Sequence, residues 1–111
     1  MDKINVEDFL DFCIAQGGKC IQHYDPNPGH PDYRLFSVWS CCAVGEYYTH
    51  LTGERLPARE ADDSDSFPLR MEHALDALGD EGTAIFDALG NYETSSYPEL
   101  VGLLRDAGAA A

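Results

Sequence analysis

Residues 36–53 constrain the fold most, because they form the longest nearly charge-free apolar run in the chain. The run holds the only tryptophan and the only adjacent cysteines. From about Ser40 its larger apolar residues recur every three or four positions, which places them on one face of a helix. Those residues are Cys41, Val44, Tyr48 and Leu51. Gly53 would end the helix in the left-handed conformation. We therefore expect a central helix on which the rest of the chain packs.

Four amphipathic segments accompany this run, at 4–18, about 67–78, 80–89 and from Ser96 onwards. Asn5 can cap the first of them, and Ser96-Tyr97-Pro98-Glu99 is a capping box that opens the last. The tail at 106–111 is expected to fray. The predicted buried faces are Val6, Phe9, Leu10, Cys13 and Ile14; Met71, Ala74, Leu75 and Leu78; Ile85, Phe86 and Leu89; and Leu100, Val101, Leu103 and Leu104.

Two β-leaning runs, 19–24 and 33–39, flank a loop that contains three prolines. They either pair as a hairpin or lead directly into the central helix. The expected fold is a mainly α single domain over 1–111, with about four to five helices around the central one. It becomes α+β if the 19–24/33–39 hairpin forms.

The charge balance narrows the class of partner. The chain has 20 Asp and Glu against 7 Lys and Arg, a formal charge of −13. Such a surface repels nucleic acid and anionic membranes, so it favours a cationic protein partner. The first residues do not resemble a secretion signal, and no apolar run is long enough to span a bilayer. These features predict a cytoplasmic protein, in the host cytoplasm if a phage encodes it.

Four cysteines and four histidines raise the question of metal or thiol chemistry. Their spacing does not match a zinc motif, so reduced thiols and surface imidazoles are the default interpretation, and no metal or cofactor is expected. A thiol-dependent enzyme or redox protein remains an alternative, with Cys20 near His23 or with Cys41 and Cys42 near a helix start, assisted by His50.

Acidic residues supply the leading hypothesis. Three of them, at 72, 76 and 80, recur every four residues, as in a row along one helix face. With the other acids, they could imitate the phosphates of a nucleic acid and occupy a basic groove. A merely solvated face, or adaptation to high salt, is the simpler alternative. The candidate binding residues are Glu72, Asp76, Asp80, Asp62, Asp63, Asp65, Glu7 and Asp11.

Tyrosines supply a second set of candidate contacts. The chain has six, more than a small core can bury with every hydroxyl satisfied. Since tyrosine is enriched at protein interfaces, we expect some rings to bind a partner, or a second copy in a homodimer. The candidates are Tyr24, Tyr33, Tyr47 and Tyr92.

Around Cys42-Ala43-Val44-Gly45 the chain resembles a group of small uncharacterised bacterial and phage proteins with a Cys-Ala-aliphatic-Gly helix start. Those proteins often close with a turn into a helix, similar to Asn91-Tyr92 through Pro98-Glu99-Leu100. The resemblance implies no activity and no catalytic residues. In size, acidity and lack of catalytic signatures the chain also looks like phage-encoded inhibitors of host defence, the anti-CRISPR proteins among them.

The sequence therefore predicts a non-enzymatic acidic binding protein. In its most specific form it is an inhibitor that occupies the basic surface of a host nucleic-acid-handling complex of the CRISPR type. A small thiol-dependent enzyme and a self-associating structural protein are the alternatives.

Overall fold

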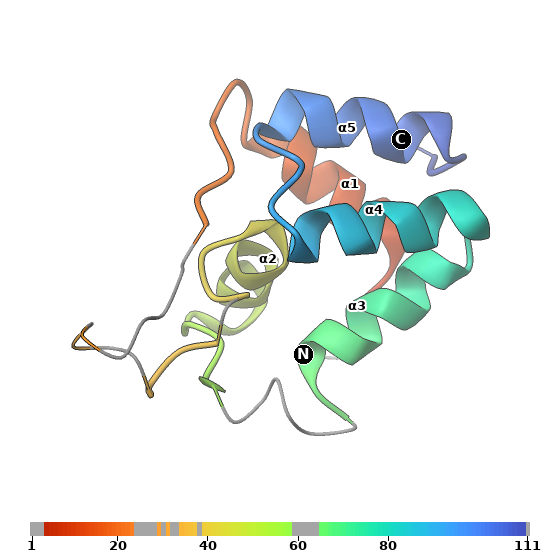
Figure 1. Cartoon of the computed structure of the whole chain (residues 1–111). Helices are drawn as coiled ribbons and strands as arrows, with labels where there is room; N and C mark the ends of the chain where they lie inside the picture. Colours follow the sequence, from red (N-terminus) through yellow and green to blue (C-terminus); the bar gives the residue numbers. More distant parts are fainter. Residues whose placement is uncertain are drawn as a thin grey trace.

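Five α-helices account for most of the residues described by the computed structural model, which are 4–23, 29, 31, 34–37, 39–58 and 65–110. The predicted mainly α class is confirmed (Figure 1). The radius of gyration is 13.2 Å, and about 13 Å is expected for one compact domain of this length. The helices are α1 (Val6–Ala15), α2 (Ala43–Thr52), α3 (Phe67–Asp76), α4 (Asp80–Gly90) and α5 (Tyr97–Asp106).

Side-chain caps fix where α1 and α3 begin. Asn5 Oδ1 accepts a hydrogen bond from the amide of Asp8 at 2.7 Å at the start of α1. Ser66 Oγ accepts one from the amide of Leu69 at 3.4 Å at the start of α3. These bonds satisfy amide groups that have no partner within the helix. Both helices are shorter than predicted. After α3 a turn leads to Gly79, whose φ of 84° is left-handed, and α4 begins at the next residue.

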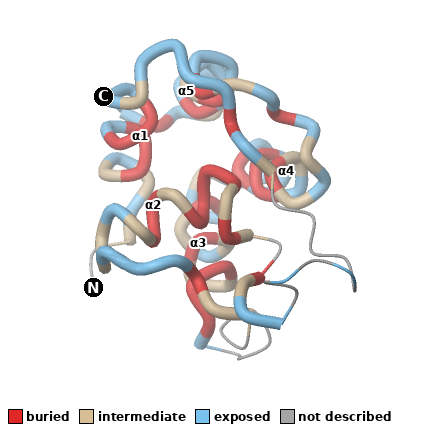
Figure 2. Tube along the Cα trace, turned by 90° about the vertical axis from the view of Figure 1, so that its left-hand side faces the viewer, coloured by how far each residue is buried: buried red, intermediate tan, exposed pale blue. Residues whose placement is uncertain are grey.

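Helix α2, which was predicted to be the central helix, buries five of its ten residues. Figure 2 shows the burial of each described residue along the chain. The helix begins at Ala43, later than predicted, so Cys41 precedes it instead of lying on its inner face. The buried thiol is Cys42, the N-cap residue, which donates to the carbonyl of Trp39 at 3.1 Å.

Two glycines allow backbones to pack unusually closely. A Cβ atom on Gly45 would lie 1.9 Å from the carbonyl oxygen of Trp39, so the segment before α2 folds back directly onto that helix. A Cβ atom on Gly82 would lie 1.8 Å from the carbonyl oxygen of Leu75, which brings α4 against α3. Any side chain at either position would force the two segments apart.

The start of α5 is tied to the segment that follows α1. Ser96 Oγ caps the helix by accepting from the amide of Glu99 at 3.3 Å. The Glu99 carboxylate reaches back to the Ser95 amide at 3.2 Å, so the capping box is displaced by one residue. Backbone bonds on both sides of a bridge between Cys20 and Ser96 join the two segments: Ile21 donates to Ser95 at 2.9 Å and Tyr97 donates to Lys19 at 3.0 Å.

The predicted hairpin is not found among the described residues of 19–24 and 33–39. Cys20 pairs with Ser96, and Phe36 pairs with Pro57, each as an isolated bridge. The first run therefore pairs with the residues before α5, and the second run pairs with the residues after α2, instead of the two runs pairing with each other.

Backbone hydrogen bonds continue beyond α5 as far as Ala109, within the segment that was predicted to fray. Gly108 adopts a φ of 103°, its amide donates to Arg105 at 3.1 Å, and the amide of Ala109 donates to Leu104 at 2.9 Å. These two bonds form a Schellman motif, and Ala109 is buried.

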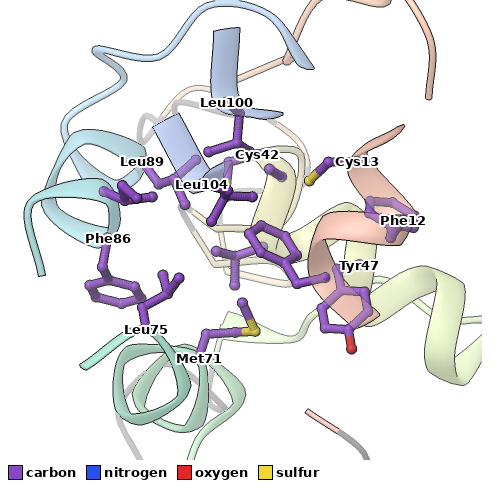
Figure 3. Packing of buried hydrophobic residues seen from close by; sticks show 14 of the residues in the cluster. Phe12, Cys13, Cys42, Tyr47, Met71, Leu75, Phe86, Leu89, Leu100 and Leu104 are labelled. Carbon is purple, nitrogen blue, oxygen red and sulfur yellow. The ribbon is translucent and has the colours of Figure 1, made fainter. Parts of the chain in front are cut away.

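All five helices contribute to one core (Figure 3). Its largest buried side chain is Tyr47, whose ring lies 5.3 Å from that of Phe9 and 5.5 Å from that of Phe12. Two residues predicted to be buried are largely exposed, Ile14 at 40% and Leu103 at 38%. Each lies at the edge of the helix face that packs on the core. In α1 and α5 this buried face is narrower than the apolar face that the sequence predicts.

Candidate functional site

The predicted row of carboxylates at 72, 76 and 80 is divided between two helices, so the single helix face was a wrong prediction. Glu72 is half-buried and Asp76 exposed on α3, whereas Asp80 is the first residue of α4. Asp76 also has a structural task, since it accepts from the hydroxyl of Thr83 at 2.9 Å across the turn.

The other predicted acids lie on separate elements. Glu7 and Asp11 are exposed on α1, and Asp65 is exposed just before α3. Asp62 and Asp63 lie outside the described residues. The described acids of the predicted set therefore come from α1, from the residue before the cap of α3, from α3 and from α4, rather than from one helix face.

The predicted tyrosine contacts are corrected at Tyr47, which has no exposed surface. Its ring lies in the core while its hydroxyl points out of the cluster and donates to the Asp8 carboxylate (Figure 3). Burial, and then Asp8, raise the pKa of this phenol. Tyr92 is half-buried and packs against His23, with ring centroids 4.5 Å apart and ring planes tilted by 41°. Tyr24 and Tyr33 lie outside the described residues.

A groove between α4 and α5 combines apolar and acidic side chains, and we call it the acidic groove. Its volume is about 360 Å³. Three carboxylates line it, from Glu81 on α4, Glu93 in the connection and Asp106 on α5. The rest of its lining is apolar and consists of Ala84, Ile85, Ala88, Leu103 and Ala107. Leu103, one of the large exposed apolar side chains, is thus part of a hollow bordered by negative charge.

The charge of the surrounding chain has the same sign. Between Arg70 and Arg105 there are seven Asp or Glu and no Lys or Arg. This stretch includes the last part of α3, all of α4 and most of α5. Most of the lining of the acidic groove falls within this stretch, and Asp106 and Ala107 lie just beyond it, next to Arg105.

A second hollow brings two cysteines together, and we call it the thiol cavity. Its volume is about 210 Å³, and Cys20 and Cys41 both line it, with Lys19, Glu46 and Tyr97. Cys20 is exposed and Cys41 is half-buried. The bridge between Cys20 and Ser96 and the start of α2 hold the two cysteines in place.

The four thiols fall into two environments. Cys41 Sγ accepts from the guanidinium of Arg55 at 2.8 Å. Cys13 and Cys42, in contrast, are buried in the core, where burial raises the pKa of Cys13 to about 12 and that of Cys42 to about 11. Core thiols of this kind stay protonated at neutral pH, so the cysteines of the cavity are the chemically available pair.

Neither histidine that was considered as a base lines the thiol cavity. His50 is in the last turn of α2 and contacts the ring of Phe12, with centroids 5.1 Å apart. Along the helix axis it is about 10 Å from Ala43, the first residue of α2, and Cys41 precedes that residue. His23 packs against the ring of Tyr92. The cavity lining therefore combines the two thiols with Lys19, Glu46 and Tyr97, and with neither of these histidines.

Within the described ranges no three His, Cys, Asp or Glu side chains come together in a way that could hold a metal ion. In the same part of the chain no helix combines the length and the apolar character needed to cross a membrane.

No protein-family model matches this chain, and neither a curated protein nor a solved structure is significantly similar to it.

The acidic groove was missed by the sequence analysis because its walls come from two helices and their connection. Two signals pointed to it. One is the cation-free stretch from 71 to 104. The other is Leu103, because it adds a large apolar residue to α5 beyond those that one buried helix face needs.

Proposed function

We propose that this protein is a non-enzymatic binding protein that holds a basic, amphipathic segment of a partner protein in the acidic groove. The observation that carries the proposal is the composition of the groove, five apolar side chains and three carboxylates. An apolar lining with polar groups at few positions is typical of binding sites, and carboxylates around it select a cationic occupant.

The occupant can be specified from the lining. Leu103 leaves 38% of its surface exposed, which offers an anchor point for an apolar side chain of the partner. Glu81, Glu93 and Asp106 come from three places around the hollow, so lysines or arginines on either side of that anchor would meet a carboxylate. An amphipathic helix with one apolar and one basic face fits this pattern.

In its most specific form, the proposal names the partner as a protein whose basic surface normally binds nucleic acid. The formal charge of −13 supports this form, because a highly negative protein is drawn to such a surface by the same long-range field as the nucleic acid. Inhibition of a host nucleic-acid-handling complex would then follow from occupation of that surface.

A peptide-binding measurement tests the groove without knowledge of the partner. The probe is a helical peptide with leucines on one face and lysines on the other, and binding is measured by fluorescence anisotropy. The variant Glu81→Gln, Glu93→Gln, Asp106→Asn should bind about tenfold more weakly, since each exposed charge contact contributes about 0.5 kcal/mol.

The matched control is Glu7→Gln, Asp11→Asn, Glu54→Gln, which removes the same number of exposed charges elsewhere. It should change the affinity less than about twofold. Equal weakening by both variants would show that the peptide senses only the total charge, and the groove proposal would be rejected.

A second pair of variants tests the apolar part of the groove. Leu103→Ala should weaken the peptide by about tenfold, because the lost methyl groups contribute about 1–2 kcal/mol when a ligand covers them. Ile14→Ala, at an apolar residue of almost equal exposure on α1, should have no effect. The reverse order of the two effects would place the binding site on α1 instead.

A further inference from the structure

The thiol cavity shares no lining residue with the acidic groove, so the proposed peptide binding gives it no role. Cys20 and Cys41 are far apart in the sequence, yet both line one hollow of about 210 Å³ that is open to solvent. Both residues therefore border the same solvent-filled space, across which a disulfide between them would form.

The cations of this region suit an anionic reagent. Arg55 donates to Cys41 Sγ at 2.8 Å, and Lys19, the neighbour of Cys20, lines the same cavity. These are two of only seven Lys and Arg in a chain with 20 acids. Glu46 also lines the cavity and contributes one opposing charge. An anionic molecule that is repelled by most of this surface therefore meets two cations beside these thiols.

The remaining cysteines cannot compete. Cys13 and Cys42 have no exposed surface, so a dissolved reagent reaches them only after the core opens. The two sides of the cavity are also firmly built: backbone bonds to the start of α5 hold Cys20, and Cys41 directly precedes the N-cap of α2.

We propose that Cys20 and Cys41 form a redox-active pair that a small anionic disulfide, of the glutathione disulfide class, converts to an internal disulfide. Cys41, as its thiolate, attacks one sulfur of the reagent and forms a mixed disulfide. The S–S bond of the reagent breaks, and its departing thiolate takes up the proton that Cys41 released. Cys20, as its thiolate, then attacks the Cys41 sulfur, and the second reagent thiol leaves with the proton of Cys20. The protein loses two electrons and two protons, and the reagent is reduced to two thiols.

The test treats the folded protein with glutathione disulfide, blocks free thiols by alkylation and maps the products by mass spectrometry. The expected product has lost the mass of two hydrogen atoms and yields one linked peptide that joins Cys20 to Cys41. Cys13 and Cys42 should be alkylated only after unfolding. A stable glutathione adduct without an internal bond, or a link that involves another cysteine, overturns the proposal.

Variants separate the two steps. Cys20→Ser should stop at one glutathione adduct on Cys41, because the resolving thiol is missing, whereas Cys41→Ser should form no internal bond.

Arg55→Gln should slow the first step by about fivefold, the equivalent of about 1 kcal/mol at an exposed contact, and Arg55→Lys should restore part of the rate. Replacement of the reagent by cystamine, a cationic disulfide, should remove the effect of Arg55. An Arg55→Gln rate equal to that of the natural protein overturns the role of the cations.

Discussion

Gly82 offers the sharpest test of how α3 and α4 are joined. A Cβ atom placed there would lie 1.8 Å from the carbonyl oxygen of Leu75, and ordinary contact begins at 3.4 Å. The difference, 3.4 − 1.8 = 1.6 Å, has to be absorbed by backbone, because the obstructing atom is not part of a side chain. Gly82→Ala should therefore destabilise the protein by about 3 kcal/mol, although alanine favours helix by up to about 1 kcal/mol.

Gly102 provides the matched control, because it lies within α5 and a Cβ atom there meets nothing within 4 Å. Gly102→Ala should stabilise the protein by about 0.5–1 kcal/mol through helix propensity alone. Both free energies of unfolding are measured by urea titration followed by circular dichroism. Equal stability of Gly82→Ala and the natural protein would refute the close contact between α3 and α4, and a loss of stability in Gly102→Ala would refute the reasoning from open space.

Three further predictions concern the core, the pH and a cap. Tyr47→Phe should lower the free energy of unfolding by about 2 kcal/mol, since the charged Asp8 loses its hydroxyl donor; an unchanged urea midpoint would contradict the bond. Stability should fall as the pH rises above 9, because the unfolded chain then ionises its thiols, whereas burial holds the pKa of Cys42 at about 11 and that of Cys13 at about 12 in the folded state. The loss should continue until the pH passes the folded-state pKa of Cys42. The urea midpoint of Cys42→Ala should therefore fall less steeply with pH than that of the natural protein. Ser96→Ala should cost about 1 kcal/mol by removing the cap of α5, whereas Ser96→Asp should retain most of the stability; a thermal melt that ranks the two variants equally would exclude the cap.

The helices could be predicted because their signals are local. Asn5 and Ser96 accept from the amides that the sequence assigned to them, and Gly53 ends α2 in the left-handed conformation. Such signals act over three or four residues and survive any tertiary arrangement. At the end of α5, the Schellman motif around Gly108 was not predicted, although Gly is the residue most common at its left-handed position.

Tertiary contacts explain most of what the sequence did not reveal. A later start of α2 by a few residues exchanged the environments of Cys41 and Cys42, since each residue turns a helix by about 100°. Tyr47 was expected at the surface because its hydroxyl needed a partner. Asp8, which lies on α1, supplies that partner to Tyr47 on α2.

The acidic groove depends on contacts of the same kind. Glu81, Glu93 and Asp106 share no periodicity, and only the packing of α4 beside α5 brings them around one apolar lining. Their common environment could not be predicted before the relative position of the two helices was known.

The most direct test of the groove is a map of where the basic peptide binds. Amide chemical shifts of the isotope-labelled protein are recorded during titration with the leucine and lysine peptide. The largest changes should fall at 81–88 of α4, at Glu93 and at 103–107 around the end of α5. Changes spread evenly over the acidic residues, or centred on Glu7 and Asp11 of α1, would contradict a specific site between α4 and α5.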